Sequence, residues 1–175
     1  NTYLRVGEAR QLTWGDIDGY ETHIDDKEQQ VRLVSFTVRA ETSKVRTTRK
    51  MITRGAEYFI RLKKRTEFTE PTHLLFSLNG VLPLDARKWQ KHWGNLMNDI
   101  GIHNHKERKL TWYSLRHFGI TMRVMANVSL IDLSKMAGTS VNHIENTYLK
   151  YSEAQSRTAA LKNFSINTDG TLLEL

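Results

Sequence analysis

The amino-acid sequence predicts a mainly helical domain with a small antiparallel β-sheet near the N-terminus, an α+β fold. Residues 31–38 are rich in β-branched and aromatic residues, and a second short run of this kind lies at residues 50–53. From residue 56 onward, apolar residues recur at helical spacing between capping residues and glycines. A chain of 175 residues is long enough for one domain with a hydrophobic core and short for two.

The predicted sheet rests on two strands and the polar segments beside them. Residues 31–38 carry apolar side chains at both alternating positions, which indicates a strand with much of both faces covered. Residues 23–30 predict the turn before this strand, and residues 39–49 predict the turn after it. Residues 50–53 therefore return as an antiparallel partner.

Along the chain, helices are expected both before and after the two strands. A first helix is indicated by three apolar residues on one face, Leu4, Ala9 and Leu12, without a convincing N-cap before it. A second helix starts at Ala56. Four later helices follow residues that commonly cap helices: Asp85, Ser114, Ser129 and Ser140. Residues 1–165 are expected to form a single domain, and residues 166–175 a C-terminal tail.

Composition narrows the class of partner. The 26 Lys and Arg residues exceed the 19 Asp and Glu residues, which gives a net charge of +7 and a pI near 9.7. This surplus favours an anionic partner such as nucleic acid, although charge alone equally fits a protein that is merely soluble. The absence of cysteine excludes disulfides and thiolate catalysis and fits a reducing cytoplasm, and no apolar run is long enough for a membrane span.

Metal and nucleotide sites are not indicated. His103 and His105 form the only close histidine pair, and they read as part of a solvated basic loop because no carboxylate stands at ligand spacing. Four aspartates could be considered as a magnesium cluster: Asp16, Asp18, Asp25 and Asp26. They lie in turn-like sequence, where an Asp side chain accepts hydrogen bonds from the nearby backbone, so a role in turns is preferred. Neither a glycine-rich phosphate loop nor a serine nucleophile elbow is present. No metal and no cofactor are expected.

Basic residues and a tyrosine remain as candidates for chemistry. Phosphoryl transfer on DNA without a metal needs cations around the phosphate oxygens, a nucleophile, and an acid for the leaving oxygen. Arginine suits the first role because its planar guanidinium stays charged and can bind two oxygens. Lysine suits the third role because its proton is transferable.

Four segments stand out together: residues 4–8 with 12–17, residues 42–44, residues 113–117 and residues 138–148. In this order and spacing they resemble the sequence boxes of tyrosine recombinases of the phage integrase family. Residues 4–8 and 12–17 resemble the first-arginine box with Arg5, and residues 42–44 resemble the β-hairpin that carries a lysine, Lys44. Residues 113–117 resemble the second-arginine box with Arg116, and residues 138–148 resemble the last box with its nucleophile, Tyr148. Each box is weak alone, but their order and spacing cover most of the chain.

The resemblance implies the fold named above and a role for each matching residue. Arg5 and Arg116 would bind the scissile phosphate, and Lys44 would protonate the leaving 5′ oxygen. Tyr148 would attack phosphorus and hold the DNA as a 3′-phosphotyrosine, without metal or ATP. Glu8 follows Arg5 by three residues and is expected to orient its guanidinium on a helix.

Two positions depart from the commonest pattern of the family. Tyr113 stands where the family often has His, and a phenol is a poor base at neutral pH. Thr139 stands where the family has His or Trp, and it is expected at a helix N-terminus that favours a phosphate. His117 offers an imidazole, but its position directly after Arg116 predicts that it points elsewhere.

Double-stranded DNA is the expected partner, and the full-length protein is expected to act as a homo-tetramer on paired sites. Further cations predicted to contact DNA are Arg46, Arg49, Lys50, Lys106, Arg108 and Lys109. The family also implies a separate N-terminal DNA-binding domain. Two alternatives stay open at this point: a topoisomerase with the same tyrosine chemistry, and a non-catalytic DNA-binding relative. Taken singly, each candidate residue also fits an ordinary ion pair or packing role.

Overall fold

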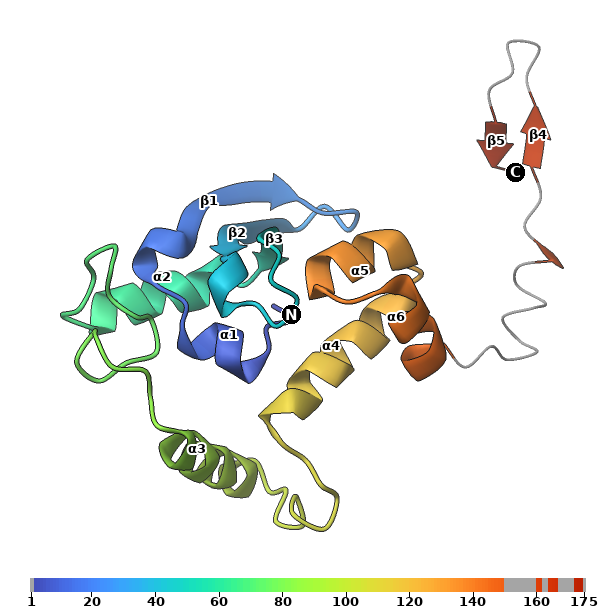
Figure 1. Ribbon diagram of the computed structural model, residues 1–175. Helices are drawn as coiled ribbons and strands as arrows, with labels where there is room; N and C mark the ends of the chain where they lie inside the picture. Colours follow the sequence, from blue (N-terminus) through green and yellow to red (C-terminus); the bar gives the residue numbers. More distant parts are fainter. Residues whose placement is uncertain (1, 150–159, 162–163, 167–171, 175) are drawn as a thin grey trace.

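The computed structural model describes residues 2–149, 160–161, 164–166 and 172–174 (Figure 1). In chain order, the helix α1 (Val6–Arg10) and a 3₁₀ turn (Trp14–Asp16) precede the strands β1 (Ile17–Ile24), β2 (Gln30–Val38) and β3 (Arg49–Arg54). The helices that follow are α2 (Ala56–Arg65), α3 (Ala86–Asp99), α4 (Trp112–Met125), α5 (Leu130–Ala137) and α6 (Val141–Tyr148). The predicted mainly helical fold with an N-terminal antiparallel sheet is confirmed.

The sheet has three strands in the order β1-β2-β3, all antiparallel. The central strand β2 buries Val34, Ser35 and Phe36 in succession, so both of its faces are covered at the centre as predicted. The edge strand β1 is an addition to the prediction. Its sequence contains Gly19 and charged residues that disfavour strands, so its conformation depends on pairing with β2.

The hydrophobic core lies between the sheet and the helices α4, α5 and α6 (Figure 1). Phe36 of β2, Met51 of β3, Ile120 of α4, Leu133 of α5 and Ile144 of α6 are all buried within it. Helix α5 contacts β3, and α4 contacts both α5 and α6. The sheet and the C-terminal helices are thereby joined in one core.

Helix starts follow the predicted caps in three of four cases. The side chains of Asp85, Ser129 and Ser140 accept backbone N–H bonds at the starts of α3, α5 and α6. Ser114 is not an N-cap: α4 begins earlier, Thr111 is its N-cap, and the Thr111 N–H donates to Ser114 Oγ at 2.9 Å. This capping box places Tyr113 inside the first turn of α4.

The aspartates behave in part as the turn prediction expects. The N–H groups of Lys27 and Gln29 donate to Asp25 in the β1–β2 turn. Asp16 accepts the N–H of Thr13 at the start of the 3₁₀ turn, whereas Asp18 lies in strand β1 and not in a turn.

The predicted tail at 166–175 falls mostly outside the described residues. Its described residues are Ile166, which ends the strand β4 (Phe164–Ile166), and the strand β5 (Leu172–Glu174), which pairs antiparallel with β4. Residues 167–171 and 175 lie outside the description. The division into residues 1–165 and a tail therefore stays a prediction. Within the described part of the chain, no helix combines the length and apolar character that crossing a bilayer requires.

Candidate active site

Arg5, the first predicted phosphate ligand, stands directly before α1 and is held by Glu8. The Glu8 carboxylate accepts the backbone N–H of Arg5 at 2.8 Å and its Nη1 at 2.9 Å. Glu8 is the third residue of α1, so these bonds close a capping box around the helix start. The expected contact between Glu8 and Arg5 is confirmed, although it arises from a helix cap and not from two residues within one helix.

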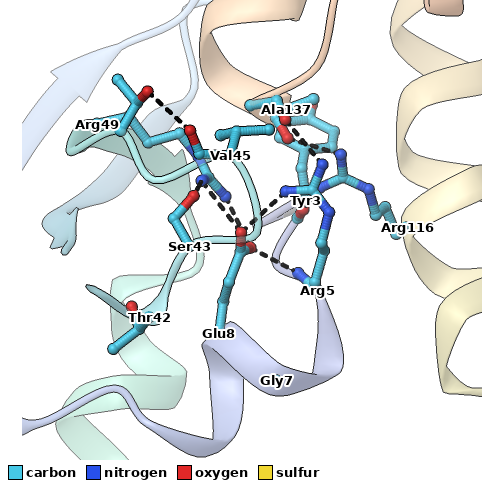
Figure 2. A network of polar contacts seen from close by, with 12 residues as sticks. Tyr3, Arg5, Gly7, Glu8, Thr42, Ser43, Val45, Arg49, Arg116 and Ala137 are labelled. Carbon is cyan, nitrogen blue, oxygen red and sulfur yellow. Dashed lines mark hydrogen bonds and ion pairs between the residues drawn. The ribbon is translucent and has the colours of Figure 1, made fainter. Parts of the chain in front are cut away.

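Glu8 also binds the guanidinium of Arg49 on β3, a contact that the sequence does not predict (Figure 2). Arg49 Nη2 lies 2.7 Å from Glu8 Oε2, and the two side chains are only 8% and 1% exposed. Burial acts to raise the pKa of Glu8, but hydrogen bonds from Arg49 and Arg5 outweigh burial and hold this pKa below its ordinary value. Arg49, predicted to contact DNA, therefore lies inside a buried polar network, and a DNA contact by it stays a prediction.

Three guanidinium groups donate to the last carbonyls of α5, those of residues 136–138. Arg49 Nε donates to the first carbonyl at 3.3 Å, Arg116 Nη2 to the second at 2.6 Å, and Arg5 Nη2 to the third at 2.8 Å. The final carbonyls of a helix lack partners within the helix and carry the negative end of its dipole, so they suit cations. This helix end therefore binds side chains from the N-cap of α1, from β3 and from α4.

Arg116, the second predicted phosphate ligand, is 4% exposed on α4. Its Nη1 donates to the backbone carbonyl of Tyr3, and the Tyr3 hydroxyl in turn accepts a bond from Arg123 Nε at 2.9 Å. Burial and the neighbouring charge of Arg5 lower the pKa of Arg116, yet a guanidinium keeps its proton in proteins. Tyr3 is a positioning residue that sequence reasoning missed, because a backbone carbonyl leaves no signal in the residue type.

Gly138 is required where α5 ends against these arginines. Its φ is +60°, and a Cβ there would lie 2.7 Å from Arg49 Nη1. We expect Gly138→Ala to lower the free energy of unfolding by about 1–2 kcal/mol, because the left-handed conformation is costly with a Cβ. Urea denaturation measures this loss.

A second glycine substitution supplies the control. Gly94 lies within α3, and a Cβ there meets nothing within 4 Å. Gly94→Ala should therefore raise the free energy of unfolding by about 0.5–1 kcal/mol. Equal stability of Gly138→Ala and the wild type would contradict the role assigned to Gly138.

Tyr148, the predicted nucleophile, lies at the end of α6 beside His117 of α4. Its hydroxyl is 2.7 Å from His117 Nδ1. Tyr113 lies one turn before His117, and its ring packs edge-on against the imidazole with centroids 4.8 Å apart. The prediction that His117 points away from the site is wrong, because α6 crosses α4 and brings Tyr148 to it.

The protonation states within this aromatic cluster follow from burial and neighbouring charge. Burial and Tyr113 raise the pKa of Tyr148, while Arg116 acts to lower it. Burial, Arg116 and His143 lower the pKa of His117 below its ordinary value. The phenol is therefore protonated and the imidazole neutral at pH 7.

Two further residues predicted for the site are Lys44 and Thr139. Lys44 is exposed in the loop between β2 and β3, near the buried Ser43, whose hydroxyl accepts a bond from Arg49 at 3.4 Å. Thr139 stands just before the N-cap of α6, where it was predicted, but its own N–H already donates to the Ser134 carbonyl at 3.1 Å.

Most of the cations predicted to contact DNA lie on the surface: Arg46, Lys50, Lys106, Arg108 and Lys109 are exposed. Lys106 also lines a groove of about 430 Å³ between α3 and the loop before α4. The groove presents further long polar side chains from α3: Arg87, Gln90, Lys91, Asn95 and Asn98.

The two histidines of the close pair differ in their surroundings. His103 is exposed, but His105 is 5% exposed and its Nδ1 lies 3.2 Å from the Ile102 carbonyl, so the prediction of a solvated loop is wrong for His105. Within the described ranges, no three His, Asp or Glu side chains are grouped closely enough to hold a metal ion.

Solved structures identify the fold. The Tn1549 transposon integrase, in complex with circular intermediate DNA, matches 91% of this chain with a TM-score of 0.59 and 20% sequence identity. The XerH site-specific recombinase, bound to its difH substrate in a pre-cleavage complex, matches 91% with a TM-score of 0.60 and 16% identity. This chain has the tyrosine recombinase catalytic-domain fold. It spans 55% of the integrase chain and 42% of the XerH chain.

The recombinase fold is recognised here through structure, since neither a protein-family model nor a curated protein sequence matches the chain. Among the described residues, the helices α1–α6 and the small antiparallel sheet agree with the fold of these solved structures. At identities of 16–20%, the comparison establishes the fold and leaves the chemistry to the residues described above.

Proposed function

We propose that this chain is the catalytic domain of a site-specific DNA recombinase that cleaves and rejoins strands through a covalent 3′-phosphotyrosine at Tyr148. The observation that carries the proposal is the convergence of four distant segments. Arg5, Arg49 and Arg116 meet at the end of α5, and the residue after Arg116 contacts the Tyr148 hydroxyl. The DNA-bound states of the Tn1549 integrase and XerH support DNA as the substrate.

Arg5 and Arg116 are assigned to the scissile phosphate. Arg5 donates to Glu8 and to the Gly138 carbonyl, and Arg116 donates to the carbonyls of Tyr3 and Ala137. A guanidinium has more N–H donors than these bonds use, so each arginine retains donors for phosphate oxygens. Because carbonyls and Glu8 already hold these side chains in place, little reorganisation is needed when negative charge develops on the phosphate.

Lys44 is assigned as the acid for the leaving 5′ oxygen. It is exposed on the β2–β3 loop, whose return strand carries Arg49 into the arginine cluster.

Exchange between two duplexes needs paired sites, so we also propose that the full-length protein acts as a homo-tetramer. Neither cleavage nor rejoining needs a cofactor, because the phosphotyrosine bond conserves the energy for rejoining.

The groove beside α3 is proposed to contact the DNA backbone. Replacing both Lys91 and Lys106 with glutamine should weaken binding and reduce the slope of log affinity against log salt by about 2, because each phosphate contact contributes about 0.9. Fluorescence anisotropy of labelled duplex DNA over a salt series measures the slope. Lys27→Gln in the β1–β2 turn is the control, and an unchanged slope in the double variant would rule out this groove.

The test of function uses the full-length protein and a nicked suicide duplex drawn from DNA that flanks its gene. After cleavage, the short end diffuses away and the covalent complex accumulates. Denaturing gels then detect the adduct, and mass spectrometry of the digested adduct identifies the modified residue. An adduct on Tyr148 supports the proposal. Tight binding without any adduct would favour a non-catalytic DNA-binding protein, and relaxation of supercoiled DNA without strand exchange would favour a topoisomerase.

A further inference from the structure

The hydroxyl of Tyr148 has an imidazole as its immediate neighbour. His117 Nδ1 lies 2.7 Å from this hydroxyl, within the range of a strong hydrogen bond. The two residues are 31 positions apart and come from α4 and α6, so packing of these helices creates the contact. The centroids of the two rings lie 5.5 Å apart, and the ring planes are tilted by 41° relative to each other.

The groups around His117 favour its neutral form. Arg116 and Tyr113 flank it on α4, while His143 and Tyr148 face it from α6. Burial comes first among the causes that lower the pKa of His117, followed by Arg116 and His143. A neutral imidazole whose proton is on Nε2 has a free lone pair on Nδ1, and the phenol can donate to it.

Tyr113 is poorly suited to receive the proton of Tyr148. It is itself a phenol and 39% exposed, and it contacts the imidazole edge-on. Its position supports the His117 ring and keeps one side of it covered. The base that position 113 lacks is thus available one helical turn later on the same face of α4.

We propose that His117 is the general base of strand cleavage, an inference that rests on the proposed function. The Tyr148 oxygen forms a bond to phosphorus as its proton passes to His117 Nδ1. The bond from phosphorus to the 5′ oxygen breaks, its electron pair stays on that oxygen, and Lys44 supplies the proton. In rejoining, the 5′ oxygen forms a bond to phosphorus as its proton returns to Lys44. The bond from phosphorus to the Tyr148 oxygen breaks, and His117 returns its proton to that oxygen.

His117→Asn separates proton transfer from orientation. An asparagine side-chain oxygen placed near the Nδ1 position can accept a hydrogen bond from Tyr148, but it does not take up a proton at neutral pH. In full-length protein on the suicide duplex, we expect adduct formation to slow about 100-fold or more, with DNA affinity unchanged. His23→Asn, an exposed histidine on β1, is the matched control and should cleave at the wild-type rate.

Two further measurements separate catalysis from a structural role. The wild-type rate should fall as the pH drops and His117 takes up a proton, and this acid limb should vanish in His117→Asn. Added imidazole should partly restore cleavage to His117→Ala and leave His23→Asn unaffected.

Three results would overturn the inference. They are wild-type cleavage by His117→Asn, an acid limb that persists in this variant, or a flat wild-type pH profile. The last of these requires no substitution, so it decides the matter even if a variant folds poorly. Failure of the wild type to form any adduct would instead contradict the proposed function itself.

Discussion

Tyr148→Phe is expected to abolish covalent attachment to DNA while DNA affinity stays within about twofold of the wild type. The substitution removes the only atom assigned to attack phosphorus and keeps the ring that packs against the core. Loss of the hydroxyl also removes one hydrogen bond, to His117, so the free energy of unfolding should fall by no more than about 1.5 kcal/mol. Denaturing gels on the suicide duplex and anisotropy on an intact duplex measure the two properties.

Tyr58→Phe is the control for this experiment. Tyr58 lies on α2 and is 65% exposed, so the same chemical change there should leave adduct formation intact. An adduct that persists in Tyr148→Phe would remove Tyr148 as the nucleophile and direct attention to Tyr113, the tyrosine on the other side of His117.

Glu8→Gln is expected to lower the free energy of unfolding by about 3–5 kcal/mol at pH 7, because it leaves the buried Arg49 guanidinium without its counter-charge. The change conserves shape and removes only the negative charge. Cleavage should also slow, since Arg5 and Arg49 lose the group that orients them. Urea denaturation of wild type and variant measures the stability difference.

The same pair of proteins tests the pH dependence. The pKa of Glu8 is lower in the folded than in the unfolded chain, so the unfolded state binds more protons in acid. The stabilisation by Glu8 is therefore complete above its ordinary pKa of 4.5 and is lost as the pH falls through its folded pKa. The stability gap between wild type and Glu8→Gln should narrow over this acidic range.

Glu41→Gln provides a matched control for burial. Glu41 pairs with Arg39 at 3.0 Å, but its side chain is 62% exposed, against 1% for Glu8. Because exposed pairs contribute little, this variant should differ from the wild type by less than about 1 kcal/mol. Equal effects of the two substitutions would show that burial of the Glu8 pair does not govern its strength.

The sequence by itself determined where a helix begins when the capping residue and the backbone that it bonds to are close in the chain. Asp85, Ser129 and Ser140 cap helices as predicted, since an N-cap bonds to backbone within three residues. Thr111 displaced Ser114 as the cap of α4 because both residues satisfy one capping box, and pattern alone does not rank them. The strand β2 was equally predictable from its β-branched and apolar residues, which stand at both alternating positions.

Tertiary structure alone decided how the site is assembled. The strand β1 carries a glycine and charges and gains its conformation from hydrogen bonds to β2. The sequence predicts that Arg49 is a surface cation, yet its side chain is buried against Glu8, 41 residues away. His117 meets Tyr148 only because α6 packs on α4. Residue types thus identified the candidate site residues. Which of these residues meet was determined by contacts between distant segments and by backbone carbonyls, which no residue type encodes.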